Sequence, residues 1–316
     1  MDEHDEWDGN EQHGQGGDDR TGDGQGGGGE RIKVALDGVP ETLLWNLYQR
    51  SVEAARPEGR VLDDPRAVEL VERIDYPFSR FGGAGLAQWH ALRIACLDAE
   101  VRRFLAAHPG GTVVALGEGL ETQFWRVDDG LVRWLSVDLP ETVAVRDRLL
   151  PPDPPHRRTL ACSALDLRWM DEVEPGIPPQ NVLVTAQGLL MYLPPRDVRK
   201  LIARCAERFP GGSFLFDAVP RAMVARSQAV QERGAESGDG YRAPAWQWGM
   251  NAGEYRKVAS ASPRIAEVRR LVLPRGRGLF AIAPVSHLVP GLRSARMSIV
   301  SVRFGPADYR NGVARG

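Results

Sequence analysis

The chain changes its pattern of apolar residues near residue 112, and this change limits the folds that it can adopt. From there on, short apolar runs alternate with stretches in which apolar residues recur at helical spacing. Such runs are typical of buried strands, and the helices between them form right-handed crossovers between parallel strands. We expect a helix at residues 195–209 and strands at residues 112–116, 132–139, 159–164, 181–186 and 212–218.

The end of the chain has a different pattern. Residues 267–273 and 297–304 are strand-like, and a stretch rich in Gly and Pro separates them, so we expect an antiparallel pair that closes the sheet. The sequence therefore predicts an α/β fold with a doubly wound, mostly parallel sheet of seven strands. The polar segment 221–264 is expected to form helix and loop over the sheet, as an insertion that covers the substrate.

The residues before the first strand have the spacing of helices. A first helix covers residues 42–55 and ends before Pro57, and a second begins near Asp64, with a proline in its first turn. A third helix covers about residues 86–107. The expected division of the chain is a helical lid at residues 31–110, an α/β domain at 111–306 and a short tail at 307–316.

The first thirty residues differ in composition from the rest of the chain. They hold ten Asp and Glu, one Arg and 10 of the 35 glycines, which gives a net charge of −9. A segment with so little apolar surface to bury cannot offset the entropy cost of ordering its backbone. We therefore expect residues 1–30 to be a disordered acidic tail, which either increases solubility or screens a basic cleft.

The remaining residues carry 39 Lys and Arg against 32 Asp and Glu, a net charge of +7. This charge suits an anionic small molecule and is too diffuse for a nucleic-acid surface. No apolar run is long enough to span a membrane, and the N-terminus lacks the features of a secretory signal. Because Cys96, Cys162 and Cys205 have no CxxC spacing, we expect neither disulfides nor a metal site, and a cytoplasmic protein.

A glycine turn follows the first expected strand at Gly117-Glu118-Gly119. At the carboxyl end of a parallel strand, such a turn lets a ligand approach bare backbone. The dinucleotide fingerprint needs a third glycine, and Thr122 stands in its place, which argues against NAD. Asp138, 21 residues after Gly117, ends the second strand, where a carboxylate can accept both ribose hydroxyls. This arrangement is the one used for S-adenosylmethionine; a plain turn and a helix-capping aspartate are the alternatives.

Longer stretches of the sequence carry a family resemblance. They include VVALGEGLETQFWRVDDG, SVDLPETVAVRDRLLP, CSALDLRWMDEV and AQGLLMYL. In this order, over about residues 37–305, they resemble the leucine carboxyl methyltransferase family, and in particular its bacterial polyketide O-methyltransferase-like branch. The resemblance implies the class I fold of S-adenosylmethionine-dependent methyltransferases and a role in secondary metabolism, such as antibiotic biosynthesis.

The resemblance also implies which residues hold S-adenosylmethionine. Arg93 matches the arginine that pairs with the carboxylate of the cofactor, a task for which a planar guanidinium is suited. The other matches are Gly117 and Gly119 against the methionine part, Asp138 and Leu139 at the ribose, and Asp166 and Leu167 beside the adenine. A surface arginine on a helix and an aspartate in a turn are the alternatives for Arg93 and Asp166.

Three positions depart from the family pattern. The family has the acid that meets the cofactor's ammonium where Gln187 stands, Asp-Thr-Arg where Glu121-Thr122-Gln123 stands, and an arginine at Ala95. Gln187 can still accept a hydrogen bond but adds no charge. On this basis Gln187→Glu is expected to tighten cofactor binding by about 1 kcal/mol. Together the departures leave open a scaffold adapted to other chemistry.

Methyl transfer from a sulfonium is an in-line displacement in which the protein aligns the reactants and excludes water. A carboxylate acceptor is already ionised at neutral pH, whereas a phenol, with a pKa of about 10, benefits from a base. His90, three residues before Arg93 on one side of a helix, is the candidate base, and Tyr192 is expected to face the sulfonium. An ordinary helix histidine and a packed core tyrosine are the alternatives.

Substrate contacts are expected from the first helix and from the polar segment that follows the fifth strand. Trp246 and Trp248 offer flat apolar faces to a ring-bearing substrate, beside Arg242. In the resemblance, Tyr48 and Arg50 lie in a helix that closes over the site. Arg50 is expected either to hold a substrate carboxylate or to pair with an acid of the lid.

We therefore expect an S-adenosylmethionine-dependent O-methyltransferase that acts on a carboxylate or phenolic oxygen of a small natural-product molecule. One alternative is a protein that keeps the cofactor fold and uses it for another reaction or for ligand binding. Another is an enzyme that methylates the C-terminal carboxyl of a partner protein. The sequence does not define the substrate, the methylated atom or the oligomeric state.

Overall fold

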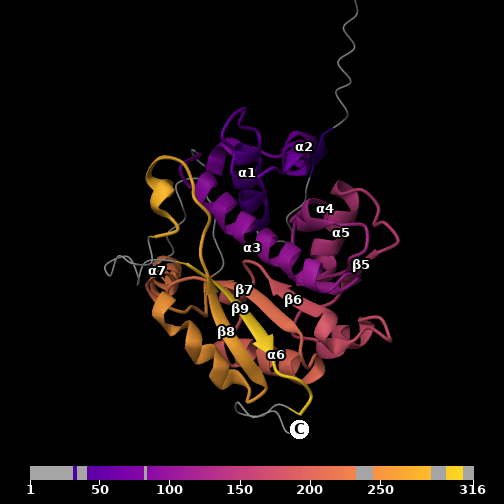
Figure 1. The fold of residues 1–316 in the computed structure, drawn as a ribbon. Helices are drawn as coiled ribbons and strands as arrows, with labels where there is room; N and C mark the ends of the chain where they lie inside the picture. Colours follow the sequence, from indigo (N-terminus) through magenta and orange to yellow (C-terminus); the bar gives the residue numbers. More distant parts are fainter. Residues whose placement is uncertain (1–30, 34–40, 82–83, 233–244, 286–296, 309–316) are drawn as a thin grey trace, which may run out of the picture. The chain divides into compact units, whose positions relative to one another are not determined.

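A central sheet of seven strands organises the computed structural model, which describes residues 31–33, 41–81, 84–232, 245–285 and 297–308 (Figure 1). The strands occur in the order β5, β4, β3, β6, β7, β9, β8 across the sheet. Their bounds are β3 (Thr112–Leu116), β4 (Arg133–Asp138), β5 (Arg157–Ala161), β6 (Val182–Ala186), β7 (Ser213–Ala218), β8 (Ile265–Leu271) and β9 (Ser298–Phe304).

The strands from β5 to β7 are parallel, and β9 runs antiparallel to both of its neighbours, β7 and β8. In register, Val114 of β3 lies opposite Leu135 of β4 and Val184 of β6. Every residue of β3 and β6 is buried, as expected for central strands that are covered on both faces. The predicted doubly wound fold and the antiparallel pair at the end of the chain are confirmed.

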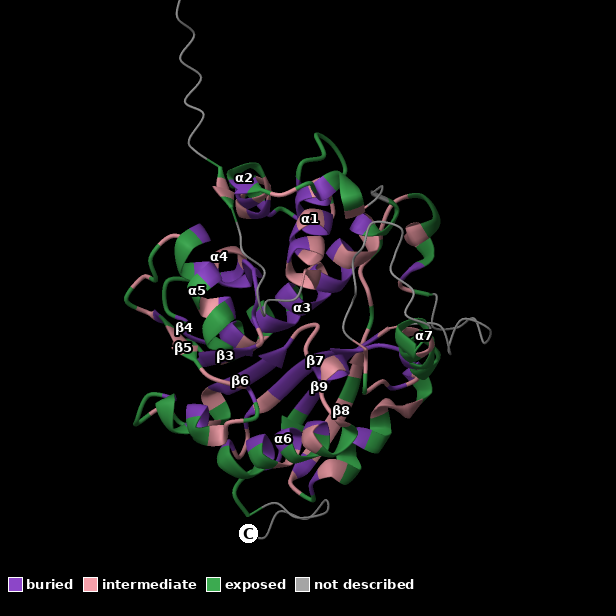
Figure 2. Cartoon of the chain, turned by 180° about the vertical axis from the view of Figure 1, so that it is seen from behind, coloured by how far each residue is buried: buried purple, intermediate pink, exposed green. Residues whose placement is uncertain are grey.

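The helices cover both faces of this sheet. Figure 2 shows α3 and α6 on opposite sides of the buried strands. The α-helices are α1 (Thr42–Ala54), α2 (Pro65–Arg73), α3 (Ala87–Ala107), α4 (Gln123–Val127), α5 (Pro140–Leu149), α6 (Pro195–Arg208) and α7 (Arg221–Glu232). The 3₁₀ segments are η1 (Phe78–Phe81), η2 (Ala84–Leu86), η3 (Leu167–Glu172), η4 (Pro179–Asn181), η5 (Leu190–Tyr192), η6 (Ala252–Ala261) and η7 (Gly278–Ile282). Two further strands, β1 (Ile32–Lys33) and β2 (Ile74–Asp75), form a small parallel pair.

Alternate residues of each strand build two separate cores. Val114 of β3 faces the cluster that contains Val198 and Ile202 of α6, whereas the preceding Val113 faces the cluster that contains Leu97 of α3 and Phe124 of α4. This alternation follows from the period of two in a β-strand. It fixes the sheet between its helix layers and so defines the edge where the strands end.

The helices before β3 share a core with the α/β part of the chain. Leu44 and Leu47 of α1 and Leu70 of α2 belong to one buried cluster with Leu120, from the turn after β3, and Leu149 of α5. The described residues belong to a compact unit that spans Arg31–Gly316. The proposal that residues 31–110 act as a lid stays a prediction.

Local sequence signals set the helix bounds. The Asp64 side chain caps α2 by accepting a hydrogen bond from the backbone N–H of Ala67 at 3.1 Å, and Pro65 opens the helix. Helix α1 ends at Ala54, three residues before Pro57, and Ala55 is its C-cap. The expected helices over residues 42–55, 86–107 and 195–209 are each confirmed to within a residue at either end.

Some sequence expectations concern parts of the chain outside the described residues. They are the acidic tail at residues 1–30, the substrate contact at Arg242, and residues 309–316 of the expected C-terminal tail. Among the residues that the structure does describe, every helix is too short or too polar to cross a membrane.

Candidate cofactor and substrate pocket

A cavity of about 270 Å³ lies at the carboxyl ends of β3, β4 and β6. After β3 the chain continues to β4 on one side, and β6 later pairs with β3 on the other, so the cavity sits where the strand order reverses. Such switch points are the usual ligand sites of open parallel sheets. The lining is mostly apolar and includes Leu43, Leu116, Leu120, Val137, Leu139, Leu189 and Leu193.

The glycine turn forms one wall of this cavity. Gly117 and Gly119 have φ angles of +60° and +54°, in the left-handed region that favours glycine. A Cβ atom on Gly117 would lie 2.8 Å from Leu189 Cδ1, and one on Gly119 would lie 2.5 Å from Leu43 Cδ2. The positive φ angles therefore favour glycine at both positions, and Gly117 lines the cavity. The approach of a ligand to this backbone stays a prediction.

Asp138 joins the end of β4 to the glycine turn. Its Oδ2 accepts a hydrogen bond from the backbone N–H of Gly119 at 2.6 Å, and its Oδ1 accepts one from Leu139 at 2.8 Å. Burial raises the pKa of Asp138, and these two N–H groups oppose the rise. Each carboxylate oxygen keeps a lone pair, and both Asp138 and Leu139 line the cavity, so Asp138 can accept ribose hydroxyls there.

Arg93 reaches the cavity from α3 and is held in place by Asp217, which the sequence analysis did not identify. Arg93 Nη1 donates to Asp217 Oδ2 at 2.7 Å, and the other oxygen of Asp217 accepts the backbone N–H of Gly188 at 2.6 Å. Arg93 Nε is buried without a hydrogen-bond partner among the described residues. The signal in the sequence was an acid near the end of the apolar strand SFLFDA.

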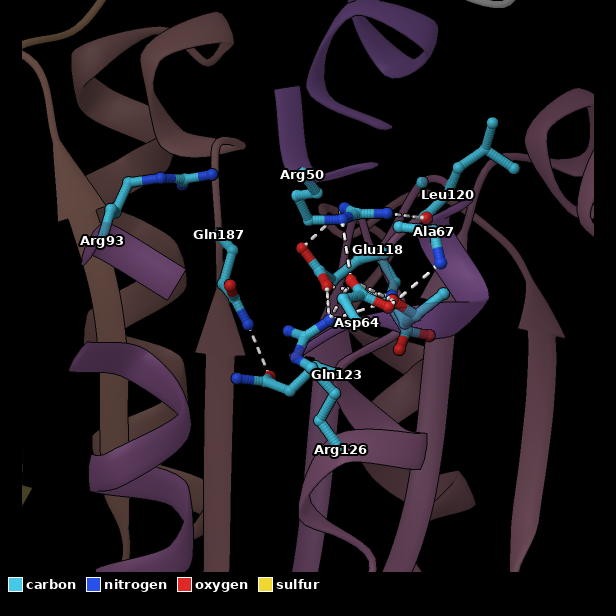
Figure 3. Close-up of polar contacts among 12 residues, drawn as sticks. Arg50, Asp64, Ala67, Arg93, Glu118, Leu120, Gln123, Arg126 and Gln187 are labelled. Atoms are coloured by element: carbon cyan, nitrogen blue, oxygen red, sulfur yellow. Dashed lines mark hydrogen bonds and ion pairs between the residues drawn. The ribbon is translucent and has the colours of Figure 1, made fainter. Parts of the chain in front are cut away.

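Gln187 lies at the end of β6 and also lines the cavity. Its Nε2 donates to Oε1 of Gln123 at 2.5 Å, as Figure 3 shows. Its own Oε1 is buried and accepts no hydrogen bond within the described part of the chain. A free buried acceptor at this position suits a cationic ligand group, such as an ammonium.

Arg50 lines the cavity, but its guanidinium is already engaged by the protein (Figure 3). It pairs with Glu121 at 2.8 Å and with Asp64 at 3.2 Å, and it donates to the backbone oxygen of Leu120 at 2.5 Å. Burial alone would raise the pKa of Glu121, but the charges of Arg50 and Arg126 lower it to about 2. Of the two expected partners for Arg50, a substrate carboxylate or a protein acid, the structure contains the protein acid.

Tyr192, the last residue of η5, lines the cavity, and Trp246 and Thr42 lie next to its hydroxyl. Burial raises the pKa of Tyr192, so the hydroxyl stays protonated at neutral pH and can donate a hydrogen bond. Trp246 packs in the same apolar cluster as Tyr192. Trp248 instead packs against Phe216, at a ring-centroid distance of 6.0 Å, and lines a second cavity beside α6.

Other predicted site residues lie outside the cavity lining, as Gly119 and Trp246 also do. The ring centroids of His90 and Trp45 lie 4.5 Å apart. Burial, together with the charges of Arg93 and Arg50, lowers the pKa of His90 to about 3. Tyr48 stacks on Phe78 in the helical segment. Asp166 caps η3 and pairs with Arg168 at 2.6 Å, and Leu167 packs against the core. From the same loop, Ser163 and Ala164 line the cavity instead.

The described residues fit S-adenosylmethionine at this cavity. The glycine turn offers bare backbone, Asp138 offers acceptors, Arg93 Nε is a buried donor without a partner, and Gln187 Oε1 is a buried acceptor without one. The fold is also similar to that of a candidate methyltransferase from Thermobifida fusca, with a TM-score of 0.50 and 17% identity, over 83% of this chain and 94% of that one. Fold and relatives together define an S-adenosylmethionine-dependent methyltransferase.

The chain belongs to the leucine carboxyl methyltransferase family, whose sequence model matches residues 44–206. It is 36% identical over 221 residues to the tetracenomycin polyketide synthesis O-methyltransferase TcmP of Streptomyces glaucescens, covering 68% of this chain and 79% of that protein. It is 28% identical over 209 residues to the S-adenosyl-L-methionine-dependent methyltransferase dpfgK of Gibberella zeae, covering 60% and 69% of the two chains. The family resemblance predicted from the sequence motifs is confirmed.

Proposed function

We propose that this methyltransferase transfers a methyl group to a carboxylate oxygen of a small, ring-bearing natural product of polyketide type. The observation that carries the proposal is the convergence of Arg93, Asp138, Gln187 and Tyr192 on one cavity at the switch point of the sheet. The relative from Streptomyces glaucescens, whose name describes it as a polyketide O-methyltransferase, supports this substrate class.

The cofactor is held by residues of the glycine turn and of three strand ends in this proposal. Arg93 binds the cofactor's carboxylate through its unpartnered Nε, and Asp217 keeps the guanidinium in place. Asp138 accepts the ribose hydroxyls while its backbone hydrogen bonds hold the turn. The adenine lies beside Ser163 and Ala164, with Asp166 and Leu167 following in the same loop.

The weakness of the candidate base favours a carboxylate over a phenol as the acceptor. When bound, S-adenosylmethionine supplies a methyl group on a positively charged sulfur. The acceptor oxygen forms the new C–O bond, the C–S bond breaks, and its electron pair stays on sulfur. A carboxylate releases no proton in this exchange, whereas a neutral phenol must lose one. His90, with a pKa of about 3, is too weak a base for that proton.

Tyr192 and the apolar walls orient the acceptor in this proposal. The protonated hydroxyl of Tyr192 donates a hydrogen bond to the acceptor oxygen that does not react. Trp246 packs beside Tyr192 and gives a flat apolar surface for a substrate ring. Leucine side chains around the cavity exclude water, which strengthens the attraction between the carboxylate and the sulfonium.

Methyl transfer to aromatic hydroxy acids tests the proposal. Each acid is incubated with methyl-labelled S-adenosylmethionine, and the product is treated with alkali, which releases labelled methanol from an ester but not from an ether. We expect alkali-labile label and a rate that changes little between about pH 6 and 9, because the carboxyl is ionised throughout. Alkali-stable label would assign the phenolic oxygen, and label on added protein would assign a protein carboxyl terminus.

A further inference from the structure

Two of the residues that depart from the family pattern lie in direct contact. Gln123 begins α4 and Gln187 follows β6, so 64 residues separate them in the sequence. The Nε2 of Gln187 nevertheless donates to the Oε1 of Gln123 at 2.5 Å (Figure 3). An arginine and a glutamate at these positions, as in the family pattern, would be a donor and an acceptor of opposite charge. This chain has a neutral pair of amides instead.

Asp98 fixes the direction of this amide pair. The Nε2 of Gln123 donates to Asp98 Oδ1 at 2.8 Å, and Arg126 Nε donates to Asp98 Oδ2 at 2.7 Å. A carboxylate can only accept, so the amide nitrogen of Gln123 must face Asp98 and its oxygen must face Gln187. Gln123 is fully buried and Asp98 is 2% exposed, so water does not compete for these bonds.

The orientation of the Gln123 amide decides which polar atom of Gln187 remains without a hydrogen bond. Since Gln187 has to present its nitrogen to Gln123, its oxygen is left over, and Gln187 Oε1 is the buried acceptor without a partner among the described residues. A buried carbonyl that accepts nothing is destabilising unless a ligand supplies a donor. Gln187 lines the cavity, where such a ligand would bind.

We propose that Gln123 is a positioning residue: anchored by Asp98, it holds the Gln187 carboxamide with its oxygen available to the ammonium of bound S-adenosylmethionine. The neutral pair thereby keeps an acceptor, Gln187 Oε1, without a partner among the described residues. This inference rests on the proposed placement of the cofactor in the cavity.

A double-mutant cycle with two nucleosides tests the inference by calorimetry. The variants are Gln123→Met, Gln187→Met and the double variant, because Met has a similar shape and no amide. The ligands are S-adenosylhomocysteine, which carries the ammonium, and 5′-methylthioadenosine, which lacks the whole amino-acid part. Gln88→Met is the matched control, since Gln88 lies on α3 outside the cavity lining and bonds to the backbone of Arg277.

We expect Gln123→Met and Gln187→Met each to weaken S-adenosylhomocysteine binding by about threefold to tenfold, the range of one hydrogen bond. Binding of 5′-methylthioadenosine should stay unchanged in every variant, which also reports an intact cavity. The double variant should bind no more weakly than Gln187→Met alone, because Gln123 acts only through Gln187. Gln123→Asn, whose shorter amide cannot bridge Asp98 and Gln187, should show the same selective loss if the Met variant fails to fold.

The inference is overturned if both Gln123 variants bind S-adenosylhomocysteine as tightly as the wild type does, or if they weaken the binding of both nucleosides equally. It is also overturned if the loss of binding free energy in the double variant is the sum of the losses in the two single variants. In each of these cases the wild type still binds S-adenosylhomocysteine, so the proposed cofactor site stands. A wild-type protein that binds neither nucleoside would overturn that site and the inference together.

Discussion

At the scale of single residues, the site depends on side chains that bond to the protein through some polar atoms and keep others available for a ligand. Asp138 uses each carboxylate oxygen for one backbone N–H and keeps a lone pair on each. Arg93 gives one nitrogen to Asp217 and keeps Nε free of described partners. This division means that one substitution changes both the shape of the site and what it offers to a ligand.

Asp138→Asn should weaken binding of S-adenosylhomocysteine by on the order of tenfold to a hundredfold. The asparagine loses the charge that strengthens hydrogen bonds from ribose hydroxyls. Its amide nitrogen would also face one of the N–H groups of Gly119 and Leu139. Calorimetry measures the effect, with Asp147→Asn as the control, because Asp147 is an exposed residue of α5. Equal affinities of the two variants would place the ribose elsewhere.

Gln187→Glu alone should not tighten cofactor binding, contrary to the expectation from the sequence. The new carboxylate gains about 1 kcal/mol with the ammonium, but it cannot donate to Gln123 Oε1, and two oxygens then face each other. Gln123 cannot turn its amide, because Asp98 holds the nitrogen. The double variant Gln123→Arg with Gln187→Glu restores a donor and should bind S-adenosylhomocysteine more tightly than Gln187→Glu does. The prediction would be contradicted if calorimetry showed that Gln187→Glu binds S-adenosylhomocysteine more tightly than the wild type does.

At the scale of elements, a buried network of charges ties the first helices to the glycine turn and α4. Arg50 of α1 pairs with Glu121, which follows the turn, and Asp64 caps α2 while accepting from Arg126 of α4 at 2.8 Å. Each of these four side chains is almost fully enclosed. Buried charges of this kind tolerate poorly the removal of one partner.

Glu121→Gln should lower the free energy of unfolding by about 3 kcal/mol at neutral pH, because Arg50 and Arg126 lose a buried counter-charge. The pKa of Glu121 is lowered from 4.5 to about 2, so its stabilising contribution is complete above about pH 4.5 and is lost as the pH falls toward 2. Urea denaturation should therefore show a difference between wild type and variant that shrinks between pH 5 and pH 2. A constant difference over this range would mean that folding does not lower the pKa of Glu121.

At the scale of the whole molecule, the helical segment and the sheet share one core within the described residues. Leu44 and Leu70 of the first two helices pack with Leu149 of α5, and α3 joins this segment to the sheet. The described core residues all come from the span between Leu44 and Phe304. The stability of the chain should therefore depend on the described helices and the sheet as one unit.

Deletion of residues 1–30 should leave the fold and methyl transfer intact. The segment has a net charge of −9 and little apolar surface, so its removal takes few buried contacts from the protein. We expect the melting temperature to change by less than about 2 °C, well below the effect of a lost core contact. Differential scanning calorimetry of the full and shortened chains, with a methyl-transfer assay of both, measures the outcome. A much larger drop would assign these residues a structural role.

The sequence by itself determined the order and kind of the elements and the edge of the sheet at which the cavity lies. Apolar runs, helical spacing, and the signals of Asp64, Pro57 and the glycine turn act over a few residues, so they can be interpreted without knowledge of the fold. The place of Asp138 at the cavity could also be predicted, because parallel strands bring their carboxyl ends to one edge of the sheet.

Only the tertiary structure decided which of these residues became partners. It placed β9 between β7 and β8, paired Arg50 with Glu121 across 71 residues, and joined Gln187 to Gln123. These contacts depend on strand order and on the exclusion of water from a shared core, which no local spacing encodes. The free oxygen of Gln187 is their consequence: the sequence shows an amide, and the fold decides which of its two polar atoms is left for a ligand.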